Sequence, residues 1–255
     1  MIHPTAIVHP AAELGPDVEI GPYCIVGEHV TIGARSTLLA HVVVNGRTTL
    51  GEDVIVHPFA SVGASSQDRK ASDDVSYTKI GNRTIIREYA SIHRATGDGN
   101  TTIVGDDCLL LAYTHVAHNC TLGNGVTMSN LAQIAGQVVV EDHAGIGGMA
   151  GIHQDVRIGA YAFVGGMTRI TRDVPPYFLV EGNPAEVHGL NSVGLRRRSF
   201  ASETISELKN AYKLIYRSGN NVRQAIELLK AEVSSDHGRA LLAFLEAPSE
   251  RGILK

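Results

Sequence analysis

The sequence predicts an all-β solenoid of short stacked strands that is closed at its C-terminal end by a small helical subdomain. Three features predict it: a six-residue period of apolar side chains, abundant glycine with few aromatic rings, and a helical period that begins at Ser199. The chain has 255 residues, of which 27 are glycine, none is tryptophan and 5% are aromatic. A core with so few rings must be built from small and branched side chains, which suits repeated stacked strands.

The six-residue repeat is the strongest signal. An apolar residue recurs every six positions from Ile2 to Val62, from Ile80 to Ile92 and from Val104 to Ile170, often followed by glycine. Period six is neither helical nor a simple strand alternation, so each hexapeptide is expected to form a short strand and a tight corner with its apolar residue inward. No rung can bury its apolar side alone, so the rungs stack around one core.

Two insertions interrupt the repeat at about residues 64–78 and 94–102. The first, containing SSQDRKASDDVSY, is strongly polar, and the second is short and rich in glycine. Loops that break a solenoid are often binding elements. A tolerated surface insertion is the alternative, because lengthening a surface loop costs little.

The repeat ends at DVPPYFLVEGNPAEVHGLN, where prolines stop the coil. Three amphipathic helices are expected beyond it, and we divide the chain into a solenoid domain, 1–190, and a helical domain, 191–255. The first helix is expected to begin at a Thr204/Glu207 capping box and to end at Gly219. The second is expected to begin at an Asn221/Gln224 box, and the third to run from about Gly238 to Glu246. These helices would cover the strand edges at the end of the solenoid.

Composition and charge exclude several functions. A net charge of −4 favours neither nucleic acid nor an anionic membrane as a partner. Cys24, Cys108 and Cys120 are too few and too scattered for a disulfide framework, and are expected to be small buried apolar residues. The N-terminus lacks the features of a signal peptide, and no apolar run reaches membrane-spanning length. We therefore expect a cytoplasmic protein without a membrane span.

The [LIV]-G-x4 pattern resembles the left-handed parallel β-helix proteins, in which three hexapeptides form one triangular coil. That resemblance, and not the period, implies the left-handed sense, since right-handed crossovers are the general rule. With eighteen residues per coil, His118, Gly136 and Gln154 stack in one outward row. Histidine suits general-base chemistry, and a glycine one rung away lets a substrate carbonyl approach a backbone N–H. A plain surface histidine is the alternative.

Zinc is the rival interpretation of His115, His118 and Cys120. Residues three apart on a strand point to opposite faces, Cys120 lies past the next corner, and no carboxylate is suitably phased. We therefore expect no metal site.

Several segments resemble the UDP-N-acetylglucosamine O-acyltransferase family over essentially the whole chain. They are SQDRK at 66–70, THVAHNC at 114–120, IGGMAGIHQD at 146–155, DVPPY at 173–177, GLNSVGLRRRSF at 189–200 and AYKLIYRSG at 211–219. The resemblance implies transfer of an (R)-3-hydroxyacyl chain from acyl carrier protein to the 3-position of UDP-N-acetylglucosamine, in the first step of lipid A biosynthesis. It also implies a homotrimer and no cofactor.

The resemblance further implies roles for single residues. His118 matches the catalytic base, Gly136 the residue whose N–H faces the oxyanion, and Gly166 a chain-length ruler that leaves room for a long chain of the 3-hydroxymyristoyl class. The matched substrate contacts are Asp68, Lys70, His115, His153, Gln154, Asn191, Arg197 and Arg198, with the arginines on the phosphate side. The basic run 196–198 also suits the acidic carrier protein.

Two positions depart from the family pattern. Asn119 stands where the family often has aspartate, and Gln137 where histidine is common. An amide cannot stabilise an imidazolium as a carboxylate does. Either change could accompany an N-acyltransferase that acts on a 3-amino analogue of the sugar nucleotide. The sequence also leaves open a zinc hydratase-like enzyme and a non-catalytic scaffold.

The repeat also predicts where Gly166 lies relative to His118. Forty-eight residues separate them, which is two coils of eighteen plus twelve, so they belong to different faces of the prism. One acyl chain can contact both positions only if neighbouring subunits pack together. Three prisms about a threefold axis satisfy this with identical contacts.

Overall fold

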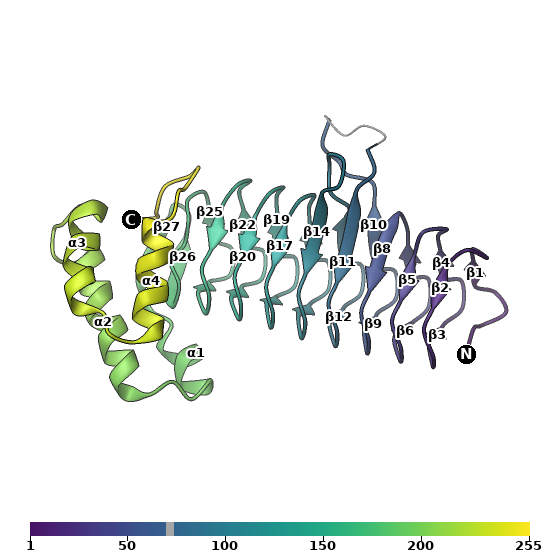
Figure 1. Ribbon diagram of the computed structural model, residues 1–255, viewed down its shortest axis with the longest axis horizontal. Helices are drawn as coiled ribbons and strands as arrows, with labels where there is room; N and C mark the ends of the chain where they lie inside the picture. Colours follow the sequence, from purple (N-terminus) through teal and green to yellow (C-terminus); the bar gives the residue numbers. More distant parts are fainter. Residues whose placement is uncertain (70–73) are drawn as a thin grey trace.

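The computed structural model describes residues 1–69 and 74–255. Figure 1 shows a long stack of coils with the helices gathered at its C-terminal end. Each coil contributes one short strand to each of three parallel sheets, and neighbouring strands in a sheet come from successive coils. The predicted left-handed parallel β-helix with a C-terminal helical cap is confirmed.

Within the described residues the sheets contain nine, eight and ten strands. The nine-stranded sheet consists of β1 (Ile7–Val8), β4 (Ile25–Val26), β7 (Val43–Val44), β10 (Ser61–Ala64), β13 (Ser91–His93), β16 (His115–Val116), β19 (Gln133–Ile134), β22 (Gly151–Ile152) and β25 (Arg169–Ile170). The eight-stranded sheet consists of β2 (Glu13–Leu14), β5 (Thr31–Ile32), β8 (Arg47–Leu50), β11 (Tyr77–Ile80), β14 (Thr101–Val104), β17 (Thr121–Leu122), β20 (Val139–Val140) and β23 (Arg157–Ile158). The ten-stranded sheet consists of β3 (Glu19–Ile20), β6 (Thr37–Leu38), β9 (Ile55–Val56), β12 (Ile85–Ile86), β15 (Leu109–Leu110), β18 (Thr127–Met128), β21 (Gly145–Ile146), β24 (Phe163–Val164), β26 (Phe178–Gly182) and β27 (Ala185–Leu190).

The core has two inward side chains per hexapeptide. The periodic apolar residue is buried in nearly every rung. The residue two positions before it is the second inward side chain and is usually smaller, as Cys120 is compared with Leu122. Cys24, Cys108 and Cys120 are free and buried, as expected. Burial raises the pKa of the Cys108 thiol to about 11.

The corners differ in detail from the expected ones. The left-handed backbone conformation falls on the third residue after the apolar one, usually not a glycine, for example Asp53 (φ 56°), Asn119 (φ 60°) and Gln137 (φ 62°). The glycine directly after the apolar residue serves close stacking instead. A Cβ on Gly105 would lie 2.6 Å from the Gly123 carbonyl carbon of the next coil.

Both insertions leave the nine-stranded sheet and return in the eight-stranded sheet, and Figure 1 shows them projecting from the same side of the stack. Each is shorter than expected, 65–76 and 94–100, because β11 and β14 lengthen to four residues and pair with each other. The loops are joined by Val75 N–H donating to Asp98 Oδ1 at 2.8 Å and Gly97 N–H donating to Asp74 Oδ2 at 3.1 Å.

The C-terminal segment begins with an antiparallel β26–β27 pair, which the sequence pattern did not predict, and continues through four helices. These are α1 (Ser192–Arg197), α2 (Ser202–Tyr216), α3 (Val222–Glu232) and α4 (Asp236–Glu246). Helix α2 packs on β27 at the end of the ten-stranded sheet. No helix among residues 1–69 and 74–255 is long and apolar enough to cross a membrane.

The predicted Thr204/Glu207 capping box is wrong. Helix α2 begins at Ser202 without a side-chain cap, and the Glu207 carboxylate instead accepts hydrogen bonds from Ser234 and Ser235, which precede α4. In the sequence alone, a glutamate that joins two helices cannot be told from one that caps its own helix, because in both cases it stands near the start of a helix. The Asn221/Gln224 capping box of α3 is confirmed.

Candidate active site

The prism has three edges, which we name by the residues that line them. The loop edge follows the nine-stranded sheet and carries both loops together with His118, Gly136 and Gln154. The aromatic edge follows the ten-stranded sheet and includes Tyr89. The charged edge follows the eight-stranded sheet and includes Arg35. Since β10, β13, β16, β19 and β22 are successive neighbours, the two loops lie directly before His118 in the stack.

His118 and Gly136 lie one above the other. A Cβ at position 136 would be 2.4 Å from the His118 Nε2, so only glycine leaves room for this imidazole. The Gly136 carbonyl accepts from the Asp155 N–H at 3.2 Å, while the described part of the chain offers the Gly136 N–H no acceptor. A free N–H thus lies beside the ring, which suits stabilisation of an oxyanion.

The His118 ring is held from both sides and is 13% exposed. Its Nδ1 is 2.9 Å from the Asn119 Oδ1, and its Nε2 is 3.8 Å from the Asp68 Oδ2 of the first loop. One coil above Gly136, the Gln154 Nε2 donates to the Gln137 Oε1 at 2.7 Å. The structure therefore brings the predicted residues Asp68, His118, Gly136 and Gln154 together on the loop edge.

Sequence reasoning missed a third imidazole at this site. His93 is buried and meets His115 edge to face with ring centroids 4.8 Å apart, and the Ser91 Oγ is 2.8 Å from the His115 Nδ1. Burial, followed by the charges of His115 and His118, lowers the pKa of His93 to about 4. Burial, and then His118, also lowers the pKa of His115. Its position one after the inward Ile92 was the signal that could have identified His93.

The expectation that His115 and His118 point to opposite faces rested on strand alternation, which does not apply to His118. Strand β16 ends at Val116, so strand alternation does not extend to residue 118. Both imidazoles lie close enough to His93 for their charge to lower its pKa. The part of the chain that the structure describes contains no group of three histidine, cysteine or acidic side chains able to hold a metal ion.

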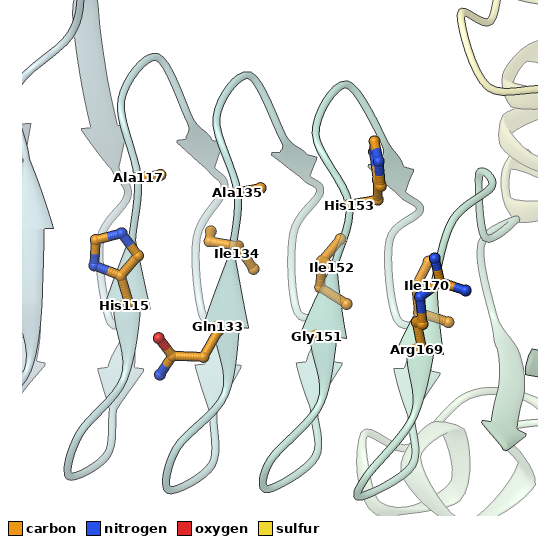
Figure 2. Close-up of a pocket in the computed structure, with 10 residues that line it drawn as sticks. All are labelled: His115, Ala117, Gln133, Ile134, Ala135, Gly151, Ile152, His153, Arg169 and Ile170. Atoms are coloured by element: carbon orange, nitrogen blue, oxygen red, sulfur yellow. The ribbon is translucent and has the colours of Figure 1, made fainter. Parts of the chain in front are cut away.

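An open groove of about 480 Å³ runs across the nine-stranded sheet next to the loop edge. Figure 2 shows His115, His153 and Arg169 along it on different coils, with Ala117 on the coil of His115 and Ala135 on the next coil. Its lining surface is mainly apolar, with His115, His153 and Arg169 as its polar members besides Gln133, so it can accept an extended hydrocarbon chain.

Asn191, Arg198 and Gly166 lie on the other two edges. On the charged edge, the Asn191 side chain donates to the Tyr161 carbonyl at 3.0 Å and caps α1 by accepting from Gly194 N–H at 3.1 Å. Arg198 is exposed there, with its Nη1 3.0 Å from His143 Nδ1. The remaining predicted positions are the exposed Arg197 at the end of α1, the exposed Gly166 on the aromatic edge, and Lys70, which lies outside the described residues.

The stacked hexapeptides and the edge histidine define the class of hexapeptide-repeat transferases. A family model described as bacterial transferase hexapeptide (six repeats) matches residues 1–34. A second, described as UDP N-acetylglucosamine O-acyltransferase, domain 2, matches residues 173–254.

Similarity to known proteins then defines the family. The chain is 47% identical over 221 residues to the acyl-[acyl-carrier-protein]--UDP-N-acetylglucosamine O-acyltransferase of Thermodesulfovibrio yellowstonii, covering 86% of this chain and 85% of the relative. It resembles the solved structure of LpxA from Acinetobacter baumannii with 44% identity and a TM-score of 0.96, covering 100% of this chain and 99% of that one. For LpxA from Bacteroides fragilis the identity is 36% and the TM-score 0.97, with both chains fully covered. The chain belongs to the UDP-N-acetylglucosamine O-acyltransferase family.

Proposed function

We propose that this chain transfers an (R)-3-hydroxyacyl group from acyl carrier protein to the 3-hydroxyl of UDP-N-acetylglucosamine, the first step of lipid A biosynthesis. The observation that carries the proposal is the 47% identity, over 86% of the chain, to a relative named for this acyltransferase reaction. The free Gly136 N–H beside the His118 ring supplies the two groups that such a transfer needs. The three free, buried thiols support a cytoplasmic location.

In this mechanism the His118 Nε2 takes the proton of the acceptor hydroxyl, and the oxygen attacks the thioester carbonyl carbon. The carbonyl oxygen becomes an oxyanion that accepts a hydrogen bond from the Gly136 N–H. Collapse breaks the carbon–sulfur bond, and the departing thiolate of the carrier takes the proton from the His118 imidazolium. The acyl group passes directly to the sugar, so no acyl-enzyme forms.

We assign the remaining residues by where they lie. On the loop edge and the adjoining groove, Asp68, His115, His153 and Gln154 would hold the sugar and the acyl chain. On the charged edge, Asn191, Arg197 and Arg198 would hold the diphosphate, since guanidinium groups form paired hydrogen bonds with phosphate oxygens. Lys70 keeps its sequence-based assignment to the same substrate. The division into domains 1–190 and 191–255 likewise stays a prediction.

The acceptor atom is tested by comparing two sugar nucleotides. With purified protein and 3-hydroxymyristoyl acyl carrier protein, we expect UDP-N-acetylglucosamine to give an ester that mild base hydrolyses. Faster transfer to the 3-amino analogue, giving a base-stable amide, would favour the N-acyltransferase. The departures at Asn119 and Gln137 make this comparison necessary. Absence of transfer to both acceptors would contradict the proposed function.

We propose that the active form is a homotrimer with its sites between subunits. The predicted site residues lie on three different edges of one prism, so a single substrate can reach them all only if neighbouring chains contribute. The aromatic edge supports association, because it carries a continuous row of exposed aromatic and aliphatic side chains. The row consists of Tyr23, His41, Phe59, Tyr89, Tyr113, Leu131, Met149 and Met167.

Light scattering is expected to give the mass of three chains. Replacing Tyr89 and Tyr113 together by serine should shift the protein towards monomer, because their stacked rings are 46% and 51% exposed in the single chain. Arg35→Ser is the matched control and should stay trimeric, because Arg35 lies several coils from Arg198 along the charged edge and its exposed ion pairs with Glu52 and Asp53 contribute only about 0–1 kcal/mol each. A fully active monomer would contradict the proposed assembly.

Gly166→Met is expected to shorten the preferred acyl chain. A Cβ at position 166 would lie 3.2 Å from the Gly148 carbonyl oxygen and 3.9 Å from the Gly148 N, so a side chain fits after a small shift of the neighbouring coil and would project into the space outside it. Competition assays with carriers of several chain lengths should show the preference moving to shorter chains. An unchanged preference in a folded variant would remove Gly166 from the acyl site.

A further inference from the structure

We infer that the second loop, residues 94–100, positions the catalytic base: the Thr96 peptide fixes the Asn119 amide, and that amide fixes which nitrogen of His118 carries the proton. The inference rests on the proposed role of His118 and assigns a function to a loop that contributes no predicted substrate contact. Four hydrogen bonds carry it.

The Asn119 side chain is held by both polar groups of one peptide. The Thr96 N–H donates to the Asn119 Oδ1 at 2.9 Å, and the Asn119 Nδ2 donates to the Thr96 carbonyl at 3.1 Å. The Asn119 backbone N–H donates to the Thr102 Oγ1 at 2.9 Å. Asparagine also tolerates the left-handed conformation found here, φ 60°. The side-chain amide of Asn119 therefore cannot flip. A flipped amide would place its NH2 group against the Thr96 N–H and its oxygen against the Thr96 carbonyl.

The fixed amide determines the tautomer of His118. The Asn119 Oδ1 lies 2.9 Å from the His118 Nδ1, and an amide oxygen can only accept a hydrogen bond. The Nδ1 must therefore carry a hydrogen, which leaves the lone pair of the neutral ring on Nε2. That nitrogen is the one that lies beside Gly136 and Asp68, where the acceptor hydroxyl must bind.

The same loop joins this base to the substrate loop. Gly97 and Asp98 hydrogen-bond the Asp74–Val75 segment at the end of loop 65–76, the loop that carries Asp68. Within loop 94–100, the Asn100 Nδ2 donates to the Thr96 carbonyl at 2.8 Å and so braces the peptide that holds Asn119. Thr96 is thus a positioning residue between the two loops and the base.

Asparagine fits this arrangement better than aspartate. A carboxylate at position 119 would keep the acceptor for the His118 Nδ1–H, but its second oxygen would face the Thr96 carbonyl without a hydrogen to donate. It would also place a second carboxylate beside the ring, in addition to that of Asp68, whose Oδ2 is 3.8 Å from the His118 Nε2. The neutral amide orients the ring without that charge.

The test compares Asn119→Ala, Asn119→Asp and Asn100→Ala. Removing a partner that orients a metal-ligating histidine typically costs about 10–100-fold, and we expect Asn119→Ala to lose a comparable amount in kcat with little change in KM. Asn119→Asp should keep more of kcat than Asn119→Ala. It should also move the acid limb of the pH profile to higher pH, because a neighbouring carboxylate stabilises the imidazolium. Asn100→Ala should show a smaller loss of the same kind.

Imidazole ¹⁵N chemical shifts of the wild-type protein and the variants give a readout that is independent of turnover. We expect the Nδ1–H form of His118 in the wild type and a mixture of tautomers in Asn119→Ala. Asn124→Ala is the matched control, because its Oδ1 accepts from the Asp106 N–H in a corner without predicted site residues. It should leave kcat and the His118 spectrum unchanged. An Nε2–H tautomer in the wild type, or an unchanged tautomer in Asn119→Ala, would overturn the inference even if acyl transfer is confirmed.

Discussion

His118→Ala is expected to abolish measurable acyl transfer, a loss of at least about 10²–10⁴-fold in kcat/KM. The imidazole is the base that the proposed reaction requires, and its Nε2 adjoins the free Gly136 N–H. The side chain belongs to the loop edge and not to the core, so thermal unfolding should change little. Single-turnover transfer from labelled acyl carrier protein measures the loss.

His9→Ala is the control for that variant. His9 is an exposed histidine on a corner of the same edge, far along the stack from the loops, and should be replaced without effect. A folded His118→Ala protein with half of the wild-type activity would contradict the assignment and favour the non-catalytic scaffold.

Gly136→Ala is expected to cost about 10²–10³-fold in kcat, comparable to the loss of an oxyanion donor. The added methyl would lie 2.4 Å from the His118 Nε2 and 2.5 Å from the His118 Cε1, so the ring must move out of its place beside Gly136. The collision is with a side chain and not with backbone, so the coil itself should persist. Steady-state kinetics together with the His118 ¹⁵N spectrum would show the loss and the displaced ring.

Gly27→Ala provides the comparison, since its Cβ would meet the Asn45 side-chain oxygen at 3.1 Å on the same edge, away from the site. It should retain activity. Wild-type kinetics in Gly136→Ala would mean that neither the N–H at position 136 nor the present place of the His118 ring matters for the reaction.

The sequence predicted the parts of the fold that depend on local period. Every rung from Val104 to Ile170 places its apolar residue inside, as expected, because an eighteen-residue coil keeps the same residues in the same column. The left-handed corner residues could not be located from composition. Positions 53, 119 and 137 carry Asp, Asn and Gln in one backbone conformation, which the stacked coils impose on whatever residue stands there.

The site was predictable where stacking alone determines it, as for His118 and Gly136 on neighbouring coils. The Thr96–Asn119 contact was not, since it depends on how a loop of irregular length folds back on the next coil. The use of Glu207 was misjudged for a similar reason, because its partners Ser234 and Ser235 are distant in sequence. Long-range contacts between loops and helices leave no periodic trace.

The most direct test of the shared site is complementation between two inactive variants, His118→Ala and Arg198→Ala. His118 lies on the loop edge and Arg198 on the charged edge, so each intersubunit site would take one of them from each neighbour. Mixed trimers from equal co-expression should recover about a quarter of wild-type activity, because about that fraction of sites joins an intact His118 to an intact Arg198. Mixed trimers that stay as inactive as the two parents would show that His118 and Arg198 do not meet across subunits.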